Sequence, residues 1–351
     1  MKTGKTLVEL ATELERQSET KKDFVASTSV LEMTPEGDLT LETETSSNEF
    51  PLTDNCHTQI ATKLDIPAKY YNRMRKEAPG LLATNVNEWF HNKPERRMIR
   101  TLDGQARAFL SDRYRRLDNY DLASSVLPIL LEMGLNKDDI VSSELTDTRM
   151  YIKVINKRVE LEVKPGDVVQ AGMVISNSEI GHGSLKVEPL VYRLICKNGM
   201  ISQDFSQKRY HVGRQVSDTE SHELYRDETL KADDHAFFLK VQDTVRAAVD
   251  ITKFSTILEQ MRSATEGKIE GNPVRAVELV SERFGFNSNE SGGVLQHLIQ
   301  GGDLSAYGLL NAITRTSQDV DNYDRCTQLE RDGSRVLSLT ASTWKEIAMA
   351  V

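Results

Sequence analysis

The chain has 351 residues, 38% hydrophobic and 28% charged, a composition typical of a soluble globular protein. Its formal net charge of −9, from 44 basic and 53 acidic residues, argues against a uniformly basic DNA-binding protein. No apolar run of about 18 residues is present to span a membrane, and the opening residues are too acidic to predict a signal peptide. Cys56, Cys196 and Cys326 are far apart in the sequence, which predicts reduced thiols rather than disulfides or a metal site.

Hydrophobic periodicity predicts helices toward both ends of the chain and short strands between them. Helices are expected at 5–16, as three short segments within 53–91, and at 120–133, 235–264 and most of 272–351. The last region holds a stretch rich in Asn, Ser and Gly, at 287–293, that is expected to be flexible. A polar loop is expected at 215–232.

Strands are predicted where apolar and polar residues alternate between turn residues. Asp103-Gly104 separates two such runs, which is a strong signal for a hairpin over 98–110. A second hairpin is expected at 149–163 with its turn at Asn156-Lys157, and residues 38–42 are expected to form an edge strand. Residues 166–201 predict a compact antiparallel meander.

These elements predict an α+β fold, with a twisted antiparallel sheet, helices packed on one face, and a mostly helical C-terminal region. The expected domains are an acidic segment at 1–50, an α+β core at 51–265 and a helical region at 266–351.

Positive charge is concentrated in one part of this acidic chain. Residues 61–120 carry 13 basic and 7 acidic side chains, a net of +6, whereas residues 1–60 carry 5 and 12, a net of −7. A second basic stretch lies at 191–214, where the net charge is +4. Such a block either faces an anionic ligand or pairs with acidic residues of the same chain.

Basic and aromatic residues alternate within these two stretches, as a single-stranded nucleic acid requires for its phosphates and bases. The predicted nucleic-acid-binding residues are Tyr70, Tyr71, Arg73, Arg100, Arg107, Arg113, Tyr114, Arg115, Arg193, Lys197, Arg209 and His211. The structural alternative is that the arginines pair with Asp103, Asp112 and Asp118 and pack along their aliphatic stems.

Other chemistries have weaker signals. Residues 59–67 resemble the opening of a helix-turn-helix, whose following helix would hold Tyr70, Arg73 and Arg75. Cys196 and His211 would suit a nucleophile and base, but Cys196 follows two apolar residues and is expected to be buried. The acidic group Asp319, Asp321 and Asp324 is expected to be a solvated loop rather than a cation site, and the histidines lack the spacing of metal ligands. No catalytic residue, metal or cofactor is therefore predicted.

Four blocks of residues, taken in this order, resemble the phage- and plasmid-borne family known as the domain of unknown function numbered 932. The blocks are residues 52–71, 98–119, 177–199 and 310–314. The resemblance extends over about residues 50 to 351 and implies a mobile-element origin and a cytoplasmic setting in a bacterial host. The order of helices, twisted sheet and long helix is also similar to that of single-strand annealing recombinases, which is an analogy of architecture alone.

Together these observations favour a non-catalytic phage or plasmid protein that binds single-stranded DNA and promotes annealing in recombination. Its expected partners are single-stranded DNA and further copies of itself, since an oligomer multiplies weak contacts, and no membrane. The alternatives are an interaction protein that inhibits a host defence factor, through a host or phage protein partner, and a helix-turn-helix regulator that reads duplex DNA.

Overall fold

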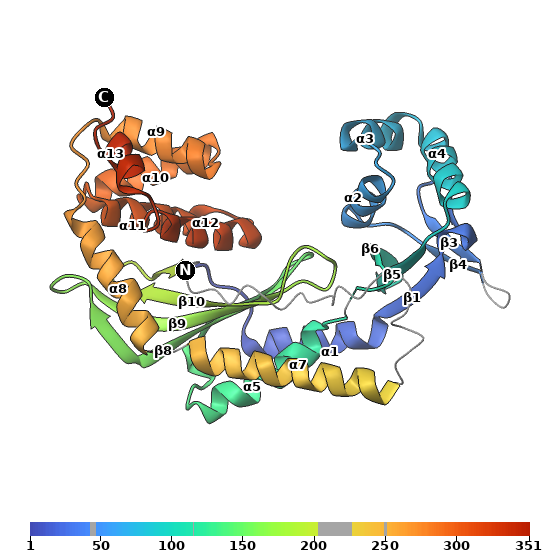
Figure 1. Ribbon diagram of the computed structural model, residues 1–351, viewed down its shortest axis with the longest axis horizontal. Helices are drawn as coiled ribbons and strands as arrows, with labels where there is room; N and C mark the ends of the chain where they lie inside the picture. Colours follow the sequence, from blue (N-terminus) through green and yellow to red (C-terminus); the bar gives the residue numbers. More distant parts are fainter. Residues whose placement is uncertain (43–46, 115, 203–226, 249–250) are drawn as a thin grey trace.

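The computed structural model describes residues 1–351 apart from 43–46, 115, 203–226 and 249–250, and side chains are not described for 227–234 and 247–248. Within this part of the chain the protein is α+β, with three antiparallel sheets. The largest sheet lies between a small group of helices, from residues 54–92, and a larger one, from residues 251–348, that stand at its opposite ends (Figure 1).

The largest sheet is a five-stranded meander in which strands adjacent in sequence are adjacent in space, in the order β11-β10-β9-β8-β7. Its strands are β7 (Ile140–Leu145), β8 (Met150–Glu162), β9 (Val168–Asn177), β10 (Lys186–Arg193) and β11 (Asn198–Ile201). The predicted meander is therefore confirmed. Gly166, in the turn between β8 and β9, has φ +79°, a conformation that a residue with a Cβ rarely adopts.

The hairpin predicted at 149–163 is wrong, because β8 continues through Asn156-Lys157 as one long strand. Its pairing with β9 shifts register between Asn156 and Glu160, so the strand bulges there instead of turning. No glycine follows Asn156 to supply the positive φ of a tight turn.

One face of the sheet is covered by α1 (Leu7–Thr20), α5 (Asn119–Glu132) and α7 (Asp227–Ala248). Alternate residues of β8 and β9 point to this face. The cluster they form with the helices includes Leu10, Val126, Ile152, Ile175 and Val241, all of which are buried. Figure 1 shows α1, α5 and α7 below the sheet.

The opposite face is covered by α12 (Tyr323–Arg335), which belongs to the helical C-terminal region. Two buried ion pairs hold it. Lys153 of β8 donates to Glu330 at 2.6 Å, and Arg331 donates to both carboxylate oxygens of Glu188 of β10 at 2.6 to 3.0 Å. Charges buried on a sheet require such partners.

A separate small lobe is built from residues 22–111. Its core joins the three helices to two three-stranded sheets, of order β1-β5-β6 and β2-β3-β4. The elements are β1 (Lys22–Ser27), β2 (Leu31–Met33), β3 (Leu39–Glu42), β4 (Ser47–Phe50), α2 (Asp54–Lys63), α3 (Ala68–Glu77), α4 (Pro79–Asn92), β5 (Arg96–Leu102) and β6 (Gln105–Ser111). The three helices and the β5–β6 hairpin match the prediction. Residues 39–42 form a strand, but it is the middle strand of its sheet, paired with both β2 and β4, and not the edge strand expected. Strand β1, which pairs with β5, is an addition.

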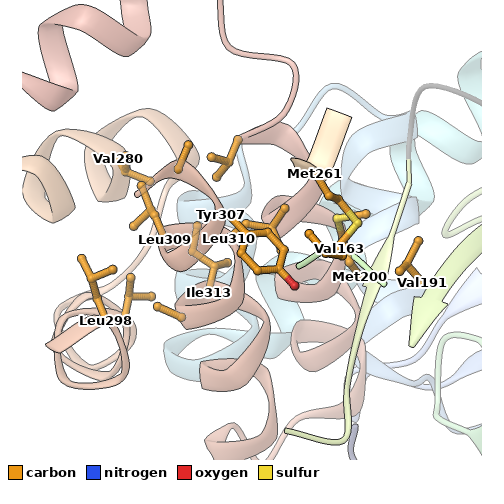
Figure 2. Packing of buried hydrophobic residues seen from close by; sticks show 14 of the residues in the cluster. Val163, Val191, Met200, Met261, Val280, Leu298, Tyr307, Leu309, Leu310 and Ile313 are labelled. Atoms are coloured by element: carbon orange, nitrogen blue, oxygen red, sulfur yellow. The ribbon is translucent and has the colours of Figure 1, made fainter. Parts of the chain in front are cut away.

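The C-terminal region is helical, as predicted, and packs against the meander through α8. Its helices before and after α12 are α8 (Ile251–Glu266), α9 (Pro273–Phe284), α10 (Ser288–Gly301), α11 (Ala306–Thr316) and α13 (Ala341–Ala348). Tyr307 and Leu310 of α11 lie at the centre of its core, and Val191 and Met200 of the sheet border it (Figure 2).

Two helix predictions need correction. The single helix expected at 235–264 corresponds to two, α7 and α8, whose apolar residues enter different clusters. The stretch at 287–293, expected to be flexible, begins α10. Asn287 accepts from the Glu290 amide at 3.0 Å while Glu290 accepts from the Asn287 amide at 2.9 Å, a reciprocal cap that starts the helix. The loop expected at 215–232 lies largely outside the described residues, and α7 begins within it at Asp227.

The first five residues run along the free edge of β7 and reach the C-terminal region. The backbone of Lys5 pairs with that of Ser143 of β7 in an isolated antiparallel β-bridge. The Lys2 ammonium donates to the carbonyls of Val320 and Asp321, at 2.6 and 2.5 Å. This segment therefore ties the edge of the sheet to the loop before α12.

Candidate nucleic-acid interface

The basic block of the small lobe meets its main anionic partner at the end of β9. Glu179, which is buried, is paired with Arg107 of β6 and accepts from the Asn119 amide at 2.6 Å. Lys21 lies 3.5 Å from the same carboxylate. Arg107 is therefore held inside a joint between the small lobe and the meander.

Arg100 lies deeper in the same joint and is not exposed. Its guanidinium donates to Asp23 at 2.8 and 3.1 Å, to Asp118 at 2.6 Å, and to the Glu179 carbonyl at 3.0 Å. Burial alone would raise the pKa of Asp118, but the charges of Arg100 and Lys21 outweigh it and hold that pKa below its ordinary value. All three guanidinium nitrogens of Arg100 thus donate hydrogen bonds within the protein.

The segment Asn177-Ser178-Glu179-Ile180-Gly181 supplies backbone partners to the same joint. The Tyr114 hydroxyl donates to the Ser178 carbonyl at 3.0 Å, and Gln59 of α2 donates to the Ile180 carbonyl at 2.7 Å. Burial raises the pKa of Tyr114. Gly181 has φ +81°, so the chain turns here, and the segment also docks α2 and Tyr114 onto the sheet.

Arg193, from the second basic stretch, joins the meander to the C-terminal helices. It donates to both oxygens of Asp167 at 2.6 and 2.7 Å, and Tyr307 of α11 donates to the same carboxylate at 2.9 Å. The guanidinium carbon lies 5.6 Å from the centre of the Tyr307 ring. Arg193 is therefore an internal link, and its face toward solvent is small.

The tip of the β10–β11 hairpin carries the exposed Lys197, in a left-handed conformation with φ +51°. Cys196 beside it is half-buried rather than buried as expected, and Arg193 donates to its sulfur at 3.2 Å. Cys56 and Cys326 are buried, and burial raises the pKa of the Cys56 thiol to about 12. All three cysteines are free, as the sequence predicts.

Helices α2 and α3 are joined by a four-residue turn, and α2 is capped at its N-terminus. Thr53 accepts from the Cys56 amide to begin α2, and Asp65, with φ +54°, reverses the chain before α3. Tyr71 and Met74 face inward, and the Tyr71 hydroxyl and His57 Nδ1 are hydrogen-bonded at 2.9 Å. Tyr71 is thus buried and its ring has no free face. Burial, helped by the charge of Arg75, lowers the pKa of His57 to about 4.

The outer face of α3 keeps a row of cations in solvent. Lys69, Arg73 and Lys76 follow one another at helical spacing, and Tyr70 beside them is 49% exposed. Arg73 contacts Glu77 at 2.9 Å, a pair in which both side chains are mostly exposed. Within the described residues Lys69 and Lys76 have no ion-pair partner. Of the predicted binding residues, this face unites Tyr70 and Arg73.

Of the remaining predicted residues, one is described by the structure and three are not. Arg113 is exposed and takes part in an interaction within the protein. Arg115, Arg209 and His211 lie outside the described residues. The acidic group expected as a loop is divided among partners, because Asp319 pairs with His297 at 2.6 Å and Asp324 accepts from Thr148 at 2.6 Å.

Among the described residues, no three or more His, Cys, Asp or Glu side chains are grouped so that they could hold a metal ion. None of the helices in the described part of the chain has the length and apolar character of a membrane span.

A family model described as "Domain of unknown function (DUF932)" matches residues 108–344, about two thirds of the chain. The match begins within β6, so α2, α3 and α4 lie before it. No curated protein and no solved structure matches the chain.

Proposed function

The chain belongs to the DUF932 family, and on that premise we propose that it is a non-catalytic phage or plasmid protein that binds single-stranded DNA and promotes annealing in recombination. The observation that supports the proposal is the exposed face of α3, where Lys69, Arg73 and Lys76 flank the half-exposed ring of Tyr70. Cations along a path and an aromatic face beside them are what a single strand needs for phosphate contact and base stacking.

The spacing on α3 suits an extended phosphate chain. Lys69 and Lys76 are seven residues apart, which is a rise of about 10 Å along a helix, and Arg73 lies between them on the same stripe. The Arg73–Glu77 pair is exposed, so it is weak and water or phosphate competes for the guanidinium. The interface can therefore accept an anion without breaking a buried contact.

The internal arginines enter the proposal in a different role. Arg100, Arg107 and Arg193 are engaged by Asp23, Glu179 and Asp167. Their pairs join the small lobe, the meander and the C-terminal helices, and so position the interface without forming part of it.

Fluorescence anisotropy with a labelled strand of about 30 nucleotides, titrated at several salt concentrations, tests the proposal. Each phosphate contact to a single strand contributes about 0.7 to the slope of log affinity against log salt, since bound counterions are released. The double variant K69E/R73E should lose at least tenfold in affinity and show a shallower slope.

The matched control is R275E on α9. Arg275 is likewise exposed and paired along a helix, with Glu278, but far along the chain from α3. The affinity of the R275E variant for the labelled strand should equal that of the wild type. Absence of wild-type binding at low salt, or equal losses in both variants, would overturn the proposal and direct the search to a protein partner, such as a host defence factor.

A duplex-reading role is the second candidate, because α2, the turn at Asp65 and α3 have the connection of a helix-turn-helix. In such motifs the N-terminal residues of the second helix contact base edges, and here these are Lys69 and Tyr70. Competition separates the two functions. An unlabelled single strand that displaces the probe far better than random duplex supports single-strand binding, whereas one preferred duplex sequence supports a regulator.

Annealing and self-association are proposed on the same basis. Acceleration of pairing between two complementary labelled strands, measured by energy transfer, tests annealing. Light scattering with and without DNA tests whether further copies of the chain assemble on the strand, as expected if many weak sites act together.

A further inference from the structure

Trp89 is the largest apolar side chain that α4 leaves exposed to solvent. The buried face of this helix consists of Leu82, Ala83, Val86 and Phe90, and the Phe90 ring packs on that of Phe109 with centroids 5.6 Å apart. The core of the lobe is therefore filled without the indole. Trp89 is 45% exposed, so a face of its indole is available for a base to stack on.

Two cations follow Trp89 closely in the chain. Lys93 lies one helical turn later, where its amide donates to the Trp89 carbonyl at 3.3 Å, and Arg96 begins β5. Both are exposed, and neither has an ion-pair partner within the described residues.

The nearby carboxylates are occupied by other groups. Glu88 accepts from Asn92 at 2.7 Å, and Glu95 is bound by Lys63 at 3.0 Å and by Arg97. The surface around Trp89 thus resembles the face of α3, where an aromatic ring also lies beside cations, two of which, Lys69 and Lys76, have no ion-pair partner within the described residues.

Helices α3 and α4 are consecutive, with Ala78 alone between them, and they meet at a corner of the small lobe (Figure 1). We propose that Trp89 is a second base-stacking platform, and that a single strand bound on α3 continues over the C-terminal end of α4, where Lys93 and Arg96 contact its phosphates. This inference rests on the proposed function and extends it, because it adds residues and defines a path.

This role of Trp89 is difficult to predict from the sequence. Trp89 follows the apolar pattern of its helix closely enough to be counted with the core, and only the burial of Phe90 at the next position shows which aromatic residue faces inward.

Intrinsic fluorescence provides the test, because the chain has only Trp89 and Trp344. A base stacked on the indole should quench the emission of the W344F variant, and a saturating oligothymidylate should produce that change at the same concentration that gives half-maximal anisotropy. W89F in the wild-type background supplies the same comparison if W344F folds poorly, since it should lose the quenching.

Affinity supplies the second readout. W89A should weaken single-strand binding about tenfold, W89F should retain most of the affinity, because a phenyl ring still stacks, and K93E should weaken it in a salt-dependent way. Y120A on α5 is the control, because Tyr120 is 42% exposed on another part of the surface.

The outcomes separate this inference from the proposed function. Salt-sensitive binding that K69E/R73E abolishes, without quenching of Trp89 and with unchanged affinity in W89A, would overturn the platform and leave the proposed function standing. Absence of any anisotropy change with wild-type protein would overturn both.

Discussion

Lys153 of β8 and Glu330 of α12 form an ion pair of 2.6 Å, and neither side chain is exposed. The next residue, Arg331, pairs with Glu188 of β10, two strands away in the sheet. Adjacent residues of opposite charge therefore reach strands on either side of β9. A shift of α12 by one residue would place like charges together, so the two pairs define how the C-terminal helices sit on the sheet.

Removing one partner of the Lys153–Glu330 pair should destabilise the protein strongly. Although burial favours the neutral amine, Glu330 outweighs it and keeps the pKa of Lys153 above its ordinary value. K153M leaves a buried carboxylate without its cation, at a cost of about 3 to 5 kcal/mol in the free energy of unfolding.

Urea denaturation checks this expectation. The double variant K153M/E330L should recover most of the loss, because an apolar pair leaves no buried charge. Equal stabilities of K153M and the wild type would show that the pair is not buried in solution.

Two arginines of the small lobe should respond in opposite ways to substitution by alanine. R107A leaves Glu179 without its main cation and should lower the free energy of unfolding by about 2 to 3 kcal/mol, with DNA affinity unchanged in protein that remains folded. R73A should lower stability by less than about 0.5 kcal/mol but weaken DNA binding. Thermal melts and anisotropy on the same samples measure both, and a purely DNA-binding defect in R107A would contradict the structure.

The free energy of unfolding should decrease as the pH is lowered through the range in which histidine titrates. The pKa of His57 is about 4 in the folded protein, against an ordinary value near 6.5, so between these values the unfolded chain binds a proton that the folded chain does not. This contribution is complete above pH 6.5 and is lost as the pH falls toward 4, by about 2 kcal/mol.

The variant H57Q measures that contribution, because glutamine can still hydrogen-bond the Tyr71 hydroxyl. The difference in unfolding free energy between pH 7 and pH 4.5 should be about 2 kcal/mol larger for the wild type than for H57Q. Identical pH profiles would show that His57 is not the responsible group.

Two glycine-to-alanine substitutions should have effects of opposite sign. A Cβ on Gly172 of β9 would lie 2.3 Å from the Val154 carbonyl oxygen of the neighbouring strand, so G172A must push β8 and β9 apart and should cost at least about 2 kcal/mol. Gly292 of α10 is exposed with nothing within 4 Å, and G292A should stabilise the helix by about 0.5 to 1 kcal/mol. Thermal melts of both variants give the signs.

Local signals predicted those elements whose chemistry is complete within a few residues. The β5–β6 hairpin follows from Asp103 and Gly104, which take φ values of +51° and +79°. The bulged continuation of β8 was not predictable in the same way, because the approach of β9 at Gly172, which excludes a side chain, is a contact between distant parts of the sequence.

The ion-pair partners of the basic residues were likewise predictable only where they lie close in the sequence. The sequence suggested Asp118 as a partner of the arginines, and Arg100 does bind it, but Asp103 pairs with Arg16 instead. Glu179, 72 residues after Arg107, could not be recognised as its partner, since only the docking of the meander brings them together. Strand alternation predicts which residues share a face, whereas burial of that face depends on what packs against it.

The contact between Lys2 and the carbonyls of Val320 and Asp321 has a consequence for the order of assembly. A chain leaves the ribosome from its first residue onward, so the groups that hold Lys2 are synthesised 318 and 319 residues after it. The meander and the helices α1, α5 and α7 on one of its faces precede these groups in the chain and can form while that contact is still missing. The bridge between Lys5 and Ser143 can therefore form before the Lys2 contact, which has to wait for the C-terminal region to be synthesised.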